Sequence, residues 1–194
     1  MSTKATRQHA NQVVDAMQAR AFTPATIINC GVGSCPEQIV WRRQMPDAHL
    51  VGIDSRANRR KLFRGQEYIK ACLGAVNGAA AEYCSAVRSL KCHVGWPGCN
   101  GRHFAVKIAT LDALAADRRW EPPYFIWMDI EGSEMDALLG AMVALAATGW
   151  INVECRNYEW DSGYADRLHN LVEHCGFALV PTEAFTEDRL YWRR

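Results

Sequence analysis

The stretch TIINCGVG, residues 26–33, decides the fold. Its first five residues are largely apolar and β-branched, which is typical of a buried strand, and glycine follows them. Pro36 comes soon after, and proline is favoured in the first turn of a helix, so residues 35–44 are expected to be helical. A strand, a glycine turn and a helix in this order form the opening unit of a parallel α/β sheet.

Strands and helices alternate along the rest of the chain. Further strands are expected at residues 49–54, 68–73, 124–129, 150–155 and 177–182, with shorter ones at 80–84, 104–108 and 190–192. Helices are expected at 57–67, 110–119, 133–147 and 163–175, and an amphipathic N-terminal helix lies within residues 1–22. This order predicts the α/β class, with a Rossmann-like, doubly wound, mostly parallel sheet and helices on both faces. Residues 1–194 are expected to form a single domain.

The composition is that of an ordinary soluble domain. Of the 194 residues, 49% are hydrophobic and 22% are charged, and the formal net charge of +1 gives no bulk attraction to nucleic acid or to a membrane. Residues 1–12 lack the apolar core of a signal peptide, and the apolar residues 137–151 are too few to span a bilayer. We therefore expect a cytoplasmic protein whose eight cysteines are mostly thiols.

Residues that follow the strands are expected to form the ligand site, because ligands of such sheets bind outside the carboxyl ends of the strands. Gly31 and Gly33 form a Gly-x-Gly turn whose backbone N–H groups can approach a ligand closely. Asp54 lies 23 residues after Gly31, near the spacing at which an acid binds ribose hydroxyls. Together they predict an adenosine-containing cofactor. The residues expected to bind it are Asn29, Cys30, Gly31, Val32, Gly33, Asp54, Ser55, Gly74, Ala75 and Asp129.

Two adenosine-containing cofactors fit this pattern to different degrees. The fingerprint for NAD has a third glycine near position 36, where this chain has Pro36. S-adenosylmethionine has no pyrophosphate and does not need that glycine. Its carboxylate suits the glycine turn, and its sulfonium cation favours nearby carboxylates. The pattern therefore favours S-adenosylmethionine, and an NAD-binding oxidoreductase is the alternative.

The segment FIWMDIEGSEMDALLGA, residues 125–141, carries the most specific motif. Its Asp-x-Glu-Gly-x-Glu element begins at Asp129, precedes a Leu-x-Gly-Ala helix, and resembles the signature of the FkbM family of methyltransferases. The resemblance extends over about residues 24–192, although the family usually has Asp where this chain has Asn29. It implies a class I methyltransferase fold and S-adenosylmethionine as cofactor, with S-adenosylhomocysteine as product. It also implies O-methylation of a hydroxyl on a sugar or small natural product.

Such a reaction benefits from a group that takes the proton of the acceptor hydroxyl. The catalytic candidates are Asp129, Glu131 and Glu154 from strand ends and His103 from a loop. An unpaired acid in a buried strand is costly, so a structural ion pair is the alternative role for Glu154. Glu134 begins a helix, where an acid stabilises the helix dipole, and we interpret it as a capping residue.

Residues 85–103 form an irregular segment with several glycines. Long irregular segments beside a site often act as lids, so we expect this one to cover the acceptor. The segment and its flanks hold possible zinc ligands: Cys84, Cys92, His93, Cys99 and His103. Their spacing lacks the Cys-x-x-Cys pattern of common zinc sites, and no metal site is predicted.

Four functions remain open from the sequence. The leading one is an O-methyltransferase for a small-molecule acceptor such as a sugar. Methylation of a nucleic acid or a protein has little support from the neutral net charge. A cofactor-binding protein without catalysis is favoured by Asn29 and Pro36, and the NAD-binding oxidoreductase is the fourth.

Overall fold

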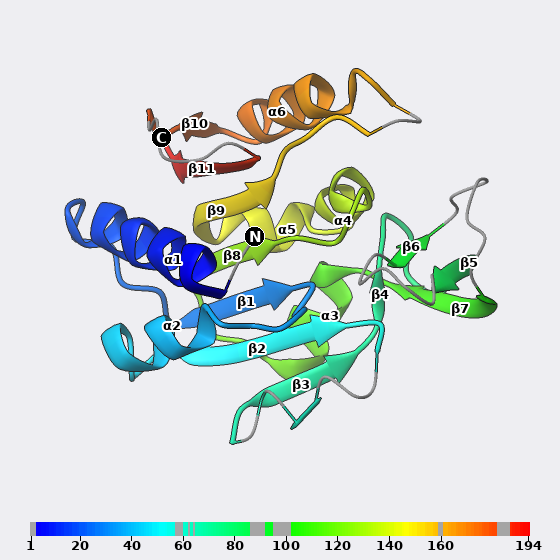
Figure 1. The fold of residues 1–194 in the computed structure, drawn as a ribbon, viewed down its shortest axis with the longest axis horizontal. Helices are drawn as coiled ribbons and strands as arrows, with labels where there is room; N and C mark the ends of the chain where they lie inside the picture. Colours follow the sequence, from blue (N-terminus) through cyan, green and yellow to red (C-terminus); the bar gives the residue numbers. More distant parts are fainter. Residues whose placement is uncertain are drawn as a thin grey trace.

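The computed structural model describes residues 3–56, 60, 61, 63, 65–85, 92–94, 102–158, 161–181 and 187–194. Within these residues, seven strands form a central sheet in the order β10-β11-β9-β8-β1-β2-β3 (Figure 1). The strands are β1 (Thr26–Cys30), β2 (His49–Asp54), β3 (Glu67–Lys70), β8 (Tyr124–Met128), β9 (Thr148–Glu154), β10 (Phe177–Leu179) and β11 (Asp188–Arg193). β11 runs antiparallel to both of its neighbours, β9 and β10, and the other pairs of this sheet are parallel. The mostly parallel sheet is therefore confirmed.

Successive residues of the central strands pack into two separate cores. Ile27 of β1 packs on the face covered by α1 (Thr3–Gln18) and α2 (Gln38–Gln44). Ile28, the next residue, packs on the opposite face. The helices there are α3 (Leu111–Arg118), α4 (Glu134–Leu139), α5 (Met142–Ala146) and α6 (Tyr164–His174) (Figure 1). Because both faces are covered, the strands need near-continuous apolar sequence, which explains why they were predictable.

The strand predicted at residues 68–73 divides at Ala71. Its first part is β3, and its second part, β4 (Cys72–Leu73), belongs to a smaller sheet in the order β4-β7-β5-β6. The other members of that sheet are β5 (Ala80–Ser85), β6 (Cys92–Val94) and β7 (Arg102–Ala109). Because β2 ends at Asp54, the chain beyond Ala71 has no partner strand in the central sheet, and it pairs with β7 instead. The second sheet was not predicted.

The helix predicted at residues 133–147 is also divided, at Gly140, into α4 and α5. A Cβ at Gly140 would lie 2.1 Å from the carbonyl oxygen of Gly74, so glycine permits this close approach of two backbones. The carboxylate of Asp112 then caps α5, because it accepts hydrogen bonds from Val143 N (3.1 Å) and Ala144 N (2.8 Å).

Two other helix boundaries differ from the predictions. The helix expected from residue 35 begins at Gln38, because Cys35 adopts a left-handed backbone with φ +48°. The segment expected to be helical at 57–67 lies partly outside the described residues, and its last residue begins β3. In contrast, the expected N-cap Thr110 is confirmed, since its hydroxyl accepts a hydrogen bond from Ala113 N at 3.2 Å.

Removing the remote cap of α5 should weaken the fold measurably. Asp112→Ala is expected to lower the free energy of unfolding by about 1 kcal/mol, because two helix N–H groups lose their acceptor. Urea denaturation measures the change. Asp117→Ala is the matched control on the same helix, because its carboxylate is 74% exposed and pairs, among the described residues, with the neighbouring Arg118. It should change the stability by less than about 0.5 kcal/mol, and equal effects of both variants would contradict the capping role.

No helix in the described residues is long and apolar enough to cross a membrane. Within the described residues, no disulfide joins Cys30, Cys35, Cys72, Cys155 or Cys175. Burial raises the pKa of the Cys155 thiol to about 11, so this side chain stays protonated at neutral pH and packs as a small apolar group.

Candidate functional site

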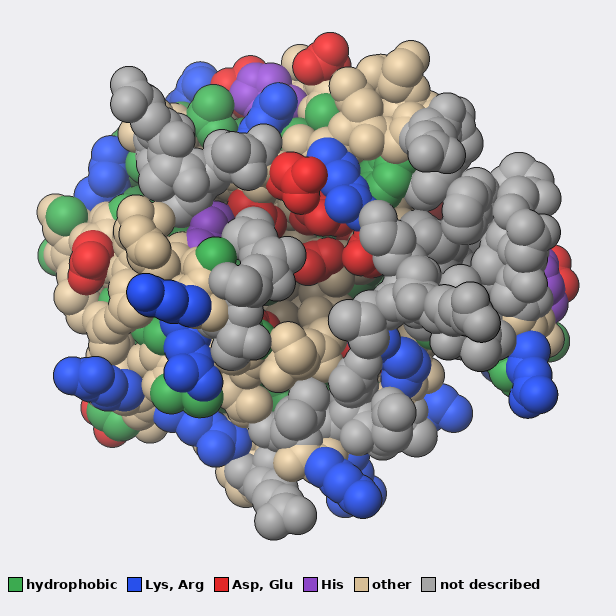
Figure 2. Space-filling view, in the orientation of Figure 1, with side chains coloured by type: hydrophobic (Ala, Val, Ile, Leu, Met, Phe, Trp, Pro, Cys, Tyr) green, Lys and Arg blue, Asp and Glu red, His purple; other side chains and the backbone are tan. Residues whose placement is uncertain are grey.

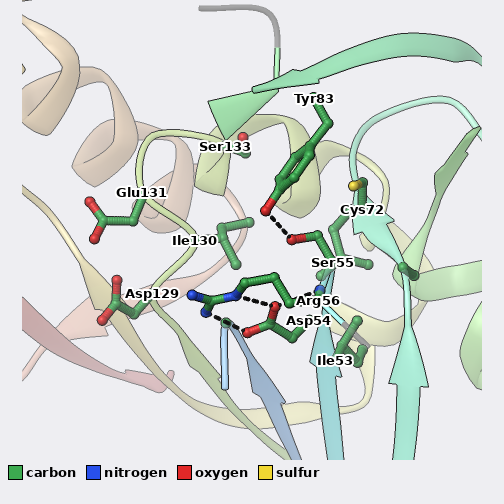
Figure 3. Close-up of a pocket in the computed structure, with 13 residues that line it drawn as sticks. Ile53, Asp54, Ser55, Arg56, Cys72, Tyr83, Asp129, Ile130, Glu131 and Ser133 are labelled. Carbon is green, nitrogen blue, oxygen red and sulfur yellow. Dashed lines mark hydrogen bonds and ion pairs between the residues drawn. The ribbon is translucent and has the colours of Figure 1, made fainter. Parts of the chain in front are cut away.

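Two cavities adjoin at the carboxyl ends of the parallel strands. The small cavity, of about 70 Å³, lies beside the ends of β2 and β4 (Figure 3). The large cavity, of about 300 Å³, lies beside the ends of β1, β8 and β9 and reaches Thr6 of α1. Both cavities have Gly31, Arg56, Asp129 and Glu131 in their walls. The structure therefore has cavities at the edge of the sheet where the sequence predicted a ligand site.

The glycine turn after β1 is held tightly against the end of β8. Gly31 has φ +87°, and a Cβ on it would lie 1.7 Å from the carbonyl oxygen of Asp129. Backbone hydrogen bonds fix this approach, with Asp129 N donating to Cys30 O at 2.9 Å and Gly31 N donating to Ile53 O at 2.8 Å. Gly31, Val32 and Gly33 all line the large cavity, as the sequence led us to expect.

Asp54 ends β2 at the wall of the small cavity, and its carboxylate is already engaged by Arg56. The backbone N and Nε of Arg56 both donate to Oδ1 at 2.9 Å, and Nη2 donates to Oδ2 at 2.8 Å. Gly33 N approaches Oδ2 only at 3.4 Å. Figure 3 shows the Arg56 guanidinium between Asp54 and Asp129. Asp54 therefore keeps one weakly used acceptor position on Oδ2.

Tyr83, from the second sheet, forms a wall of the small cavity that sequence reasoning missed. Its hydroxyl accepts a hydrogen bond from Ser55 at 2.7 Å, and its ring is buried (Figure 3). Residues 71–73 form the adjacent wall, whereas the expected Gly74 and Ala75 line neither cavity. The bend of the chain at Ala71 causes this displacement, since it directs the strand end into the second sheet.

Three predicted carboxylates meet in the large cavity: Asp129, Glu131 and Glu154. Asp129 is open to the cavities, yet the enclosing protein and the charge of Glu131 raise its pKa to about 8. Glu154 is buried, and its burial together with the charges of Asp129 and Glu131 raises its pKa to about 9. Carboxyl groups with pKa values near neutrality are suited to proton transfer at physiological pH.

Arg156 forms ion pairs with two of these carboxylates, and the sequence analysis did not predict it as a site residue. Its Nη2 donates to Glu131, its Nε lies 3.4 Å from Glu154 Oε1, and its Nη1 lies 3.9 Å from Glu187 Oε2. The guanidinium carbon also lies 5.0 Å from the centre of the Tyr158 ring. A basic residue two positions after a strand-end acid was the signal in the sequence that could have revealed it.

Residues 60–179 match the protein family described as Methyltransferase FkbM domain. The chain belongs to the FkbM methyltransferase family. The match includes the strand end at Asp129 and the acid at Glu154, so the resemblance drawn from the sequence is confirmed. S-adenosylmethionine is accordingly supported as the cofactor. No curated protein sequence matches the chain.

The chain has the class I methyltransferase fold, and a solved methyltransferase with a TM-score above 0.5 shares it. Magnesium protoporphyrin IX methyltransferase from Synechocystis, with bound S-adenosylmethionine, is 10% identical, with a TM-score of 0.52 and coverage of 98% of this chain and 80% of that one. Precorrin-6y C5,15-methyltransferase from Geobacter metallireducens is 11% identical, with a TM-score of 0.49 and coverage of 95% and 87%. Human N-acetylserotonin methyltransferase is 9% identical, with a TM-score of 0.45 and coverage of 96% of this chain and 57% of that one.

In this FkbM-family chain, Asn29 stands where the resemblance led us to expect an acid, and a neighbouring residue brings a carboxylate to it. Asn29 is fully buried, and its Nδ2 donates to Glu37 Oε1 at 2.9 Å and to Cys35 Sγ at 3.2 Å. Burial raises the pKa of Glu37. Neither Asn29 nor Cys30 lines a cavity, and Cys30 packs into the core on the opposite face of the sheet. Among the described residues, the acid at this turn thus comes from Glu37.

Glu134 of the FkbM motif supports the loop after β8. Its buried carboxylate accepts hydrogen bonds from Ile130 N (2.9 Å), Gly132 N (2.9 Å) and the Tyr164 hydroxyl (2.8 Å). These bonds fix the loop that carries Glu131, which has a left-handed φ of +57°. Glu134 is therefore a structural clamp for the loop, and its carboxylate bonds to N–H groups that precede α4 and not to the helix that it was expected to cap.

His103 is not brought to the other catalytic candidates. It lies on β7, its Nδ1 is 3.1 Å from Glu82 Oε1, and it lines neither cavity. The backbone register sets Cys84 opposite both His93 and His103. The side chains of Cys84, Cys92 and His93 and the whole of Cys99 lie outside what the structure describes, as does most of the expected acceptor lid at 85–103. In the described part of the chain, no group of three or more metal-binding side chains gathers.

The raised carboxyl pKa values predict how stability depends on pH. The pKa values of Asp129 and Glu154 are about 8 and about 9 in the folded chain and about 4 in the unfolded chain. Between about pH 4 and the folded pKa values, the folded chain therefore binds more protons than the unfolded chain. Their contribution to stability is present below about pH 4 and is lost as the pH rises toward 9. Relative to an Asp129→Asn, Glu154→Gln double variant, the wild type should lose free energy of unfolding between pH 5 and pH 9. Urea denaturation across this range measures it, and parallel curves for the two proteins would contradict the assignment.

Proposed function

We propose that this chain is an O-methyltransferase that binds S-adenosylmethionine across both cavities and methylates a hydroxyl of a small molecule in the large cavity. The observation that carries the proposal is the position of Asp129, which directly follows β8 and lines both cavities together with Glu131. A group there can act on an acceptor in one cavity while facing a cofactor that extends from the other.

The described residues fit the cofactor in shape and chemistry. Ile53, Leu73 and the Tyr83 ring give the small cavity an apolar wall suited to adenine. Asp54 offers the weakly used acceptor position on Oδ2 to a ribose hydroxyl. The absence of a side chain at Gly31 lets the turn after β1 approach the backbone carbonyl of Asp129, at the edge that both cavities share. Glu131 provides negative charge where the cations of the methionine part would lie.

When bound, S-adenosylmethionine supplies a methyl group activated by a sulfonium. Asp129 in its ionised form would take the proton of the acceptor hydroxyl, which would prepare the hydroxyl oxygen to receive that methyl group. A pKa near 8 makes this carboxylate a stronger base than an ordinary one. Arg156 and the Glu134 clamp hold Glu131 in place, so the alignment that in-line transfer requires is built in before the acceptor binds.

The volume of the large cavity supports a small acceptor. About 300 Å³ is at the lower end of the range for small-molecule sites, and the wall carries several acids that would repel a nucleic-acid backbone. These features favour a hydroxylated metabolite over a nucleic acid.

Transfer of an isotope-labelled methyl group to a panel of acceptors tests the proposal. The panel contains sugars, hydroxylated aromatic compounds, RNA and a protein extract. We expect label on a hydroxyl oxygen of a small molecule, identified by NMR of the product. Label only on nitrogen or carbon, or only on a macromolecule, would contradict it.

A further inference from the structure

The carboxylate of Asp54 is almost fully used by one neighbouring side chain. An ionised carboxylate has about four acceptor positions. The backbone N and Nε of Arg56 fill the positions of Oδ1 at 2.9 Å, and Arg56 Nη2 donates to Oδ2 at 2.8 Å. Gly33 N, at 3.4 Å, uses the remaining position only weakly. A ribose presents two adjacent hydroxyls, so Asp54 has no room to accept both while the Arg56 guanidinium stays in place.

The small cavity is also too narrow for a nucleoside in this arrangement. Its volume is about 70 Å³, whereas pockets for small molecules measure roughly 300–1,000 Å³. Ile53, Leu73 and Tyr83 are buried and belong to strands, so this part of the wall is fixed. The Arg56 side chain is 21% exposed, follows the end of β2 and lines both cavities. It is therefore a part of the wall that can move without disturbing a sheet.

The backbone of Arg56 is held in place independently of its guanidinium. Its N–H donates to Asp54 Oδ1, and its carbonyl oxygen accepts a hydrogen bond from the Tyr68 hydroxyl. If the side chain turned away, the bonds from Nε to Oδ1 and from Nη2 to Oδ2 would be released, one on each oxygen of Asp54. Two adjacent hydroxyls can replace these bonds one for one. The guanidinium thus occupies the positions that the hydroxyls of a ribose would take.

Acids on the other side of Arg56 can receive the released guanidinium. Figure 3 shows it between Asp54 and Asp129. Asp129 and Glu131 share the walls of both cavities with Arg56, and Figure 2 shows acidic side chains gathered in a hollow of the surface. Movement toward these acids would keep the guanidinium beside negative charge, so the exchange on Asp54 does not leave it unpaired.

We propose that Arg56 competes with the cofactor for Asp54, so that the ribose hydroxyls of the bound nucleoside take the place of its guanidinium. This inference rests on the proposed function for the identity of the cofactor. The exchange also widens the small cavity toward the large one. The wild-type chain therefore binds a nucleoside more weakly than the rest of the wall allows, and removal of the Arg56 side chain strengthens that binding.

Calorimetric titration with adenosine measures the competition. We expect Arg56→Ala to bind adenosine at least about fivefold more tightly than the wild type, because charge-assisted hydrogen bonds no longer have to be broken. In an Asp54→Asn background, which has no carboxylate to compete for, the same substitution should change the affinity by less than about twofold. Arg167→Ala is the matched control, because it removes an exposed arginine of α6 from its ion pair with Asp161, and it should keep the wild-type affinity.

An unchanged or weaker affinity of Arg56→Ala would overturn the inference, because Arg56 would then support the site. An equal gain in the Asp54→Asn background would also overturn it, since the guanidinium would obstruct the cavity without competing for Asp54. Arg56→Lys, which keeps the charge but lacks the planar two-point contact, serves as a second variant if Arg56→Ala does not fold, and it should also bind adenosine more tightly.

Titration with S-adenosylhomocysteine separates this inference from the proposed function. Failure of the wild type and of Arg56→Ala to bind it counts against the proposed function. Binding to the wild type without a gain in Arg56→Ala counts only against the competition between Arg56 and the ribose.

Discussion

Asp129→Asn is expected to lower the rate constant of methyl transfer by about 10²- to 10⁴-fold, the range that general base catalysis supplies. The amide keeps the size and the backbone contacts of the aspartate, including the bond from Asp129 N to Cys30 O, but it cannot take a proton from the acceptor. Binding of S-adenosylhomocysteine should weaken by less than about tenfold, because the small cavity keeps its walls. Single-turnover transfer of a labelled methyl group and calorimetric titration measure the two quantities.

Asp117→Asn is the control for this variant, because it makes the same chemical change on an exposed side chain of α3. Its rate and affinity should match those of the wild type. If Asp129→Asn lowered the affinity by as much as the rate, Asp129 would be a cofactor ligand and not the base. A rate within about threefold of the wild type would exclude both roles.

Gly31→Ala should have the largest effect on stability. The added Cβ would overlap the carbonyl oxygen of Asp129, and the backbone of Gly31 is in the left-handed region at φ +87°. Positive φ alone costs about 1–2 kcal/mol for alanine, and the clash with backbone forces the ends of β1 and β8 apart. We expect the free energy of unfolding to fall by more than about 3 kcal/mol, a large part of the 5–15 kcal/mol that is typical of a domain.

Gly78→Ala separates the two contributions to that loss. Gly78 has φ +77°, and nothing lies within 4 Å of a Cβ placed on it. It should therefore show only the conformational cost of about 1–2 kcal/mol. Urea denaturation of both variants gives the difference, which we assign to the contact between β1 and β8. Equal losses would show that the contact with Asp129 is not tight in solution.

The sequence was sufficient where a residue's place follows from its own strand and turn. Gly31, Gly33, Asp54 and Asp129 each stand directly after a strand with a clear apolar pattern. Parallel strands bring their carboxyl ends to one edge of the sheet, so local patterns were enough to predict that these residues share a site.

The residues that were missed depend on contacts between distant parts of the chain. Tyr83 reaches Ser55 because the second sheet folds back over the end of β2, and Arg156 reaches Glu131 across neighbouring loops. Gly74 was expected at the site because the predicted strand ran straight to it, whereas the chain leaves the central sheet at Ala71. Such bends depend on which strand is available as a partner, and one strand's sequence does not contain that information.

Asn29 is a second position where the sequence alone was insufficient, because the carboxylate near it comes from another residue. Considered alone, Asn29 argued for weakened cofactor binding. In the fold, Glu37 comes from the start of the following helix to bond with it, so a carboxylate is present at the same turn. Since Asn29 lines neither cavity, we expect its contribution to be the shape of the turn and not direct contact with the cofactor.

Calorimetric titration of the purified chain with S-adenosylhomocysteine and, separately, with NAD tests the central claim most directly. The glycine turn without a third glycine, the acid at Asp54 and the carboxylates around Asp129 predict one-to-one binding of S-adenosylhomocysteine and no measurable binding of NAD. Binding of NAD, or of neither compound, would contradict the assignment of these cavities to a methyl donor.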